Sequence, residues 1–340
     1  MKKRIGIVGV GGVASYAHIP SYINRDIEVW SICDIDEKKL NTIGNLYNIS
    51  RRYTDIEEMI KRENIDILDI ATPPSSHKEI LKIANKYKVQ VVMQKPLITD
   101  KKEMDDISSL ILNSDRFKLN MQGRYVSAWM KIKELLKNES IGKPFMCTII
   151  NNDWWDREEG RWDLNINNYI IFEMLIHHLD LCNFWFGKPF KVTARGGKND
   201  SQNIKNMNYI NVMLEYKNGL IVQIIENWGM SEYDFSTGHP FEDILITGEK
   251  GTIKANSEMV KLSRINNNEM NVWLHPRPGQ KLPCDILKNN WFNDAFGELM
   301  NDFIHNNNIG SDEDKNYAIE LTKMLFKIAE ATTSDNWIEF

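Results

Sequence analysis

A glycine-rich turn near the N-terminus constrains the fold of this chain more than any other feature. The run from Gly9 to Ala14, GVGGVA, directly follows the β-branched segment Arg4–Val8 and precedes a segment of helical spacing. In such a strand, turn and helix, the first glycine allows the tight turn and the second lets the backbone approach a pyrophosphate held at the helix N-terminus. The predicted dinucleotide-binding residues of this turn are Gly9, Gly11, Gly12 and Val13.

Short β-branched segments alternate with segments of helical spacing over the first third of the chain. Apolar residues recur at intervals of three and four in each helical segment, as in amphipathic helices that pack on a sheet. This order predicts an α/β fold with a doubly wound Rossmann domain and a parallel sheet. The predicted strands are Arg4–Val8, Ile27–Cys33, Ile67–Ile70, Val89–Met93 and Lys118–Met121, and the predicted helices are Ser15–Ile23, Glu37–Leu46, Ile56–Arg62, His77–Tyr87 and Lys102–Asn113.

The rest of the chain has a different pattern, in which strand-like segments outnumber helices. Because 340 residues exceed the roughly 250–300 at which a single core stops growing, we expect two domains, residues 1–122 and 123–340. The second is predicted to be α+β with a mostly antiparallel open sheet, and the closing helix, about 314–332, is expected to pack back on the first domain. Its predicted helices are Val126–Lys137, Ile170–Trp185 and Asp314–Thr332, and its predicted strands are Lys143–Asn151, Phe190–Gly196, Asn208–Tyr216, Leu220–Asn227, Asp243–Gly248 and Gly251–Lys254.

An acidic residue at the end of the second predicted strand supports a dinucleotide site. Asp34 follows the glycine turn by about twenty residues, where a carboxylate accepts hydrogen bonds from the ribose hydroxyls of NAD and repels the 2′-phosphate of NADP. NAD is therefore the predicted cofactor, and NADP is less favoured. The alternative is that Asp34 caps the helix that follows, a role that suits Asp36 better.

The third predicted strand also ends in a ligand-binding pattern. It runs into Ala71-Thr72-Pro73-Pro74, where the prolines stop the sheet at its carboxyl edge, the edge at which open α/β sheets bind ligands. Thr72 and Pro73 are predicted to contact the cofactor. His77, which begins the next predicted helix, is either a further cofactor contact or a solvated or capping residue.

Several motifs follow one another along nearly the whole chain. They are Ile5–Gly12 with His18 and Pro20, then Asp34, Ala71–Pro74 with His77, Gln94–Leu97, Arg124 with Tyr125, Glu173-x-x-x-His177-x-x-Asp180, and Thr247–Thr252. In this order they resemble the Gfo/Idh/MocA oxidoreductase family. The resemblance implies NAD-dependent hydride transfer with a secondary alcohol of a sugar, a sugar derivative or a cyclitol, in a homodimer or homotetramer that needs no metal.

The resemblance assigns a role to the lysine that follows the fourth core strand. Lys95 matches the family lysine that serves the nicotinamide ribose and the substrate. The family usually has Glu-Lys-Pro, whereas this chain has Gln94, which keeps a hydrogen-bond acceptor but removes a negative charge. Gln94 and Lys95 are thus predicted cofactor contacts, and Lys95 is also predicted to stabilise a developing alkoxide.

Glu173 and His177 are four residues apart in the predicted helix Ile170–Trp185, so they share one face of it. A carboxylate one turn from a histidine can orient the ring and raise its basicity, which suits a general base. Taken alone, such a pair is most often a surface ion pair. Within the resemblance, His177 is the predicted base and a substrate contact, Glu173 is its orienting partner, and His178 on another face is predicted to be structural.

Aromatic and charged side chains predict the substrate region. Trp154 and Trp155 could pack on sugar C–H faces while Arg161 grips hydroxyl groups. The alternative is that these tryptophans belong to a core or a subunit interface. Arg124 and Tyr125, at the start of the second domain, are also predicted substrate contacts.

Bulk properties exclude several other classes of protein. A formal net charge of −5 argues against nucleic acid or an anionic membrane as the main partner. No segment approaches the roughly 20 apolar residues of a membrane span, so we expect a cytoplasmic protein. The four cysteines lack paired spacing and are expected to be buried thiols.

Two other functions stay open: a lyase, hydrolase or isomerase that uses tightly bound NAD transiently, and a non-catalytic sugar or nucleotide sensor, for which Gln94 is the only hint.

Overall fold

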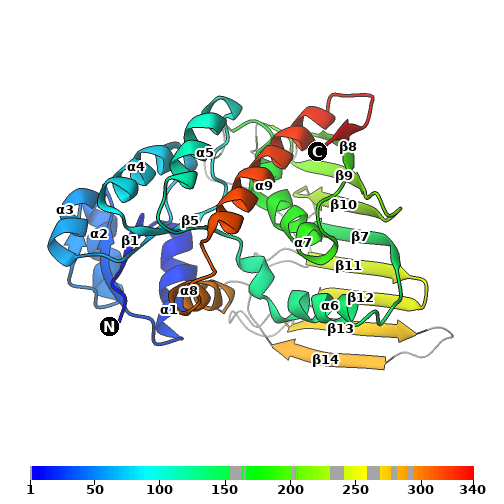
Figure 1. Ribbon diagram of the computed structural model, residues 1–340, viewed down its shortest axis with the longest axis horizontal. Helices are drawn as coiled ribbons and strands as arrows, with labels where there is room; N and C mark the ends of the chain where they lie inside the picture. The colour runs from blue at the N-terminus through cyan, green and yellow to red at the C-terminus, as the bar shows by residue number, and fades with distance from the viewer. Residues whose placement is uncertain are drawn as a thin grey trace. The chain divides into compact units, whose positions relative to one another are not determined.

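The computed structural model describes residues 2–153, 163, 166–200, 202, 204, 206–229, 241–258, 269–276, 282–288 and 294–340. The chain forms two compact units, both drawn in Figure 1. The first unit contains residues 1–125 and 291–323, and the second contains residues 126–290 and 324–340. Within the described residues, no helix is long and apolar enough to cross a membrane.

The first unit is built on a six-stranded parallel sheet with the order β3-β2-β1-β4-β5-β6. This order confirms the predicted doubly wound domain, and it places a topological switch point between β1 and β4, where such sheets bind ligands. All four residues of β1 and of β4 are buried, as expected for central parallel strands. The strands are β1 (Ile5–Val8), β2 (Val29–Cys33), β3 (Arg52–Tyr53), β4 (Ile67–Ile70), β5 (Gln90–Gln94) and β6 (Phe117–Asn120).

The helices of the first unit follow the predicted ones closely, apart from the first helix and α8. The first begins as a π-helical segment, Ala14–His18, and continues as α1. The helix α8, which contains Gly297, was not predicted. A Cβ on Gly297 would lie 2.6 Å from the carbonyl oxygen of Ser21, so α8 needs glycine to approach α1. The α-helices are α1 (Ile19–Ile23), α2 (Glu37–Leu46), α3 (Ile56–Glu63), α4 (His77–Tyr87), α5 (Met104–Leu112), α8 (Ala295–His305) and the beginning of α9 (Asp312–Ala331).

The core of the first unit joins segments that are far apart in the sequence. Ile5 and Ile7 of β1 pack in one buried cluster with Leu299 and Phe303 of α8. Arg116 reinforces this joint, since its guanidinium donates hydrogen bonds to the carbonyl oxygens of Phe303, Asn306 and Ile309. Residues of α8 and of the turn that follows it are therefore part of the unit that carries the glycine turn.

The second unit contains a nine-stranded sheet with the order β14-β13-β12-β11-β7-β10-β9-β8-β15, which Figure 1 shows from β8 to β14. Among the strand pairs in the described part of this sheet, β7–β10 alone is parallel, so the predicted mostly antiparallel sheet is confirmed. Strands β13, β14 and β15 were not predicted. The bounds are β7 (Pro144–Asn152), β8 (Lys191–Gly197), β9 (Tyr209–Glu215), β10 (Ile221–Asn227), β11 (Phe241–Gly248), β12 (Gly251–Glu258), β13 (Glu269–Pro276), β14 (Leu282–Lys288) and β15 (Ile338–Glu339).

Two helices cover one face of this sheet (Figure 1). The helix α6 (Ser127–Lys137) contacts α7 (Ile176–Phe186), and the indole of Trp185 donates a hydrogen bond to the carbonyl oxygen of Trp129. A π-helical segment, Ile171–Leu175, leads into α7. Residues 176–182 are all buried, so α7 is a core helix rather than a half-solvated one.

Candidate active site

The glycine turn lies at the carboxyl end of β1 and is shaped by close backbone contacts. Gly9 has a φ of 88°, and a Cβ there would lie 2.7 Å from the Cγ2 of Thr72 and 2.9 Å from the carbonyl oxygen of Ala71. A Cβ on Gly11, by contrast, would meet nothing within 4 Å. The turn thus packs tightly on the end of β4 at Gly9 and leaves open space at Gly11, which fits the close approach of a pyrophosphate.

Asp34, at the end of β2, is tied to the glycine turn. Its Oδ2 accepts a hydrogen bond of 2.8 Å from the amide of Val10, and its Oδ1 accepts one of 2.9 Å from the amide of Asp36. Asp36 itself caps α2 by accepting from two backbone amides of the first turn, so the capping alternative for Asp34 is wrong. Asp34 is half-buried, and each carboxylate oxygen retains a second lone pair for a ribose hydroxyl.

The loop after β4 is held in place by His77, which begins α4. The ring is fully buried, with its Nε2 2.9 Å from the carbonyl oxygen of Thr72 and its Nδ1 3.0 Å from that of Leu97. Burial lowers the pKa of His77, against the opposing effect of the two carbonyl groups. The alternative of a solvated His77 is therefore wrong. His77 shapes the loop that carries Thr72 and Pro73, and its contact with a cofactor stays a prediction.

Lys95 directly follows β5, and a buried polar network reaches its backbone. The Gln94 side chain, 6% exposed, accepts a 2.9 Å hydrogen bond from the amide of Lys95 at its Oε1. Its Nε2 lies 3.2 Å from the Nε2 of His18, whose Nδ1 lies 2.7 Å from the Oδ2 of Asp69 in β4. The hydroxyl of Tyr22 donates to the same carboxylate oxygen at 2.7 Å.

His18 belongs to a motif recognised in the sequence, whereas the roles of Asp69 and Tyr22 were not predicted. A signal was present, because Asp69 is the one polar residue of the strand Ile67–Ile70, and a carboxylate in a buried strand needs partners. The identity of those partners, Tyr22 of α1 and His18 of the π-helical segment, was not predictable from spacing.

The predicted base and its partner lie in the second unit. Glu173 belongs to the π-helical segment, and its Oε2 accepts a 3.1 Å hydrogen bond from the hydroxyl of Tyr169. His177 lies in the first turn of α7 and is 6% exposed. The predicted four-residue spacing assumed a regular α-helix, whereas the wider π turn changes the relative direction of residues 173 and 177. Their joint action in catalysis stays a prediction.

His178 is buried between two carboxylates of the sheet, which agrees with a structural role. Its Nδ1 lies 2.5 Å from Glu226 and its Nε2 lies 3.0 Å from Glu242. Glu226 and Glu242 flank Asn151 in register on three neighbouring strands. Burial alone would lower the pKa of His178, but the two carboxylates outweigh it and raise the pKa well above the ordinary value. Burial raises the pKa of Glu226, and His178 opposes this shift.

Arg124 and Tyr125 end the N-terminal part of the first unit and are engaged there. The Arg124 guanidinium lies over the ring of Tyr317 at 4.3 Å, and the Tyr125 hydroxyl donates to Asp302 at 2.8 Å. Burial, and next Asp302, raise the pKa of Tyr125 far above its usual range. Substrate contact by these two residues stays a prediction. Three other predicted substrate residues, Trp154, Trp155 and Arg161, lie outside the described residues.

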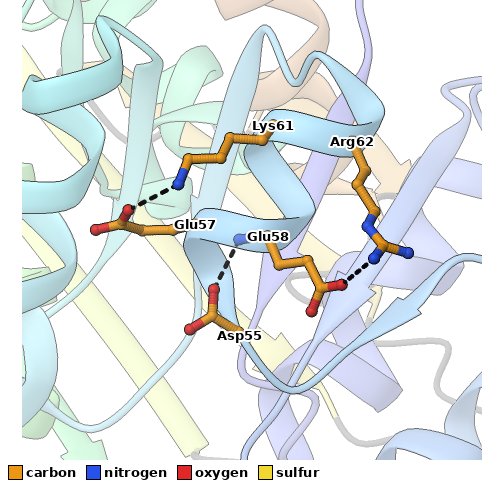
Figure 2. Close-up of a pocket in the computed structure, with 5 residues that line it drawn as sticks. All are labelled: Asp55, Glu57, Glu58, Lys61 and Arg62. Carbon is orange, nitrogen blue, oxygen red and sulfur yellow. Dashed lines mark hydrogen bonds and ion pairs between the residues drawn. The ribbon is translucent and has the colours of Figure 1, made fainter.

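A surface hollow at the start of α3 is lined by charged side chains (Figure 2). Lys61 pairs with Glu57 at 3.3 Å, and Arg62 pairs with Glu58 at 2.9 Å. Asp55 accepts a hydrogen bond from the backbone amide of Glu58 and caps the helix. Both ion pairs join residues four apart on α3, so these charged side chains have a helix-stabilising role.

Comparisons with known proteins agree with this geometry. Residues 3–116 match the family model described as "Oxidoreductase family, NAD-binding Rossmann fold", and residues 129–254 match the GFO/IDH/MocA C-terminal domain. A D-apiose dehydrogenase from Rhizobium rhizogenes is 28% identical over 66% of this chain and 65% of its own length, which is slightly less than two thirds. The myo-inositol 2-dehydrogenase of Thermotoga maritima is 23% identical over 75% of each chain. An oxidoreductase from Agrobacterium radiobacter, solved with NAD+, L-tartaric acid and magnesium, shares the fold, with a TM-score of 0.84, 18% identity, and coverage of 100% of this chain and 98% of its own.

Proposed function

Because the chain belongs to the Gfo/Idh/MocA family of oxidoreductases, we propose that it is an NAD-dependent dehydrogenase of a sugar, a sugar derivative or a cyclitol. The observation that carries the proposal is the carboxyl edge of the first sheet. There the open turn at Gly11, the carboxylate of Asp34 and the end of β5 at Lys95 follow β1, β2 and β5. The named activities of the apiose and inositol relatives support the substrate class.

The first unit supplies the groups that would hold NAD. The backbone from Gly9 to Val13 binds the pyrophosphate, with Gly11 and Gly12 allowing its approach. Asp34 accepts hydrogen bonds from the ribose hydroxyls, and Thr72 and Pro73 line the adjacent carboxyl edge of the sheet. When bound at these residues, NAD would supply the acceptor for the hydride of the substrate carbon.

The proton and the developing charge are handled by side chains of the protein. His177 removes the hydroxyl proton as general base, and Glu173 is the positioning residue that orients its ring. Lys95 stabilises negative charge on the substrate oxygen as the proton leaves. Arg124, Tyr125, Trp154, Trp155 and Arg161 are the proposed contacts to the remaining substrate hydroxyls.

The second unit also has a surface that suits self-association. Inward residues of its sheet, such as Val222 and Ile224, are buried, while alternate residues face away from the helices and are at least partly exposed. Such an apolar, solvent-facing sheet surface is typical of a subunit interface, so a homodimer or homotetramer is proposed. The apolar residues of this surface are Met146, Ile150, Tyr209, Met213, Ile221, Ile225 and Leu245.

A cytoplasmic location is part of the proposal. Cys33, Cys147 and Cys182 are buried free thiols, which is ordinary in a reducing compartment. Burial raises the pKa of Cys33 to about 12, so this thiol stays protonated. The side chain of Cys284 lies outside the described part of the chain.

A substrate panel tests the proposed activity. The purified protein is mixed with NAD or NADP and with aldoses, ketoses, lactol sugars and cyclitols, and the absorbance of reduced nicotinamide is followed. We expect at least one compound to give reduction with NAD and slower reduction with NADP, and His177→Ala to abolish it. Failure of every compound with a protein that binds NAD, or normal turnover of His177→Ala, would contradict the proposal.

A further inference from the structure

The network that ends at Lys95 lies inside the core of the first unit. His18, Asp69 and Tyr22 have no exposed surface, and Gln94 is 6% exposed. The ring of Phe296 lies against that of His18, with centroids 4.5 Å apart. Buried polar groups of this kind are costly unless each donor meets an acceptor, so the positions of the protons follow from the partners.

The backbone amide of Lys95 decides how the Gln94 side chain is oriented. A backbone N–H can only donate, so the Gln94 group that faces it must be the amide oxygen. The Oε1 of Gln94 does lie 2.9 Å from the amide nitrogen of Lys95. The NH2 group of Gln94 then faces His18, and it can only donate. The alternative orientation would place two donors against each other at Lys95.

The orientation of Gln94 in turn decides the protonation of His18. Because the Gln94 NH2 group donates across the 3.2 Å contact, the Nε2 of His18 must accept and carries no proton. The Nδ1 of His18 carries the proton and donates to Asp69 at 2.7 Å. Tyr22 donates to the same carboxylate, and burial, and next Asp69, raise its pKa well above the usual value.

We propose that Gln94 locks His18 as the neutral Nδ1–H tautomer, and that this pair is a positioning device which holds Lys95 at the end of β5 across the physiological pH range. Adding a proton to the Nε2 of His18 would place an N–H of the ring against the N–H of Gln94, an arrangement with no acceptor between the two groups. The groups that face His18 are Gln94 from β5, Asp69 from β4, Tyr22 from α1 and Phe296 from α8. The role assigned to Lys95 rests on the proposed function, whereas the tautomer does not.

A glutamate at position 94 would change this arrangement in a defined way. Its carboxylate would still accept from the amide of Lys95, but toward His18 it could offer only an acceptor. His18 would then donate from both ring nitrogens as an imidazolium between two carboxylates, and the network would bind one more proton. Gln94 therefore makes the support of Lys95 independent of a titrating histidine.

The direct test is 15N-edited NMR of the histidine rings in the whole chain, with His18→Phe used to assign the His18 signals. Wild-type His18 should show a protonated Nδ1 and a bare Nε2 from about pH 5.5 to pH 8. In Gln94→Glu both nitrogens should be protonated at neutral pH. A wild-type His18 protonated at Nε2, or one that titrates within this range, would overturn the proposal even if a variant failed to fold. His305→Gln, at the exposed end of α8, is the control that should leave the His18 signals unchanged.

A second readout separates positioning of Lys95 from general stability. Gln94→Leu removes the acceptor for the Lys95 amide, so kcat should fall on the order of ten- to a hundredfold while the Kd for NAD changes less. Gln94→Glu should retain most of the turnover but gain an additional ionisation in its pH profile. An unchanged kcat in Gln94→Leu, with the NMR result as predicted, would refute the positioning role and leave the tautomer and the dehydrogenase activity standing. Absence of turnover in the wild type would instead refute the proposed function alone.

Discussion

Two glycines of the same turn offer a sharp test, because alanine should affect them differently. At Gly9, the φ of 88° alone costs about 1–2 kcal/mol for a residue with a Cβ. The overlap with Thr72 and with the carbonyl oxygen of Ala71 adds about 1–3 kcal/mol of overpacking. Gly9→Ala should therefore lower the free energy of unfolding by roughly 2–5 kcal/mol. At Gly11 a Cβ meets no atom within 4 Å, so Gly11→Ala should change stability by less than about 0.5 kcal/mol.

The affinity for NAD should respond differently from stability, because Gly11→Ala is expected to weaken NAD binding while leaving the free energy of unfolding nearly unchanged. The methyl group of Gly11→Ala would occupy the space through which the pyrophosphate approaches the backbone, and we expect at least about a tenfold rise in Kd, equivalent to about 1.4 kcal/mol. Calorimetric titration with NAD and thermal unfolding of both variants measure the two quantities. Wild-type affinity in a folded Gly11→Ala protein would refute the placement of the cofactor, and wild-type stability of Gly9→Ala would refute the packing argument.

Two further substitutions test the other groups of the account. Asp34→Asn keeps an acceptor for the Val10 amide but removes the charge, so calorimetry should show weaker NAD binding and a smaller preference over NADP; an unchanged preference would contradict the role of Asp34. His178→Leu leaves Glu226 and Glu242 buried without their cation and should lower the free energy of unfolding by about 3–5 kcal/mol at neutral pH. Because the folded-state pKa of His178 is raised to about 10, its stabilisation is present below the unfolded value of 6.5 and is lost as the pH rises through about 10. Denaturant titrations across pH should show the difference from wild type shrinking in that direction, and a constant difference would contradict the ion-pair account.

Local patterns predicted most of the fold, and the exceptions have physical causes. The alternation of buried strands and amphipathic helices was sufficient for β1, β4, α2 and α4, whose burial follows directly from the sequence pattern. The short strands β3 and β15 contain two residues each, too few for any periodicity. They exist because a neighbouring strand supplies the hydrogen bonds.

The candidate site was predictable to the extent that it is local. The glycine turn, Asp34 and the end of β5 follow strands of a parallel sheet, so their common edge could be inferred from the order of elements. The partners of His18 could not be inferred in this way, because Asp69 and Gln94 lie 51 and 76 residues away along the chain. Likewise, the π turn before α7 was not predicted, because the sequence there has the same spacing as a regular α-helix.

Direct transfer of a hydride from the substrate carbon to NAD can be followed with a deuterium label. The best substrate of the panel is deuterated at the candidate alcohol carbon and incubated with the protein and NAD, and the nicotinamide is then recovered and analysed by mass spectrometry. We expect one deuterium per molecule of reduced nicotinamide, formed in proportion to the oxidised sugar or cyclitol. Conversion of the substrate with the nicotinamide recovered oxidised and unlabelled would contradict it, and would indicate transient use of tightly bound NAD instead.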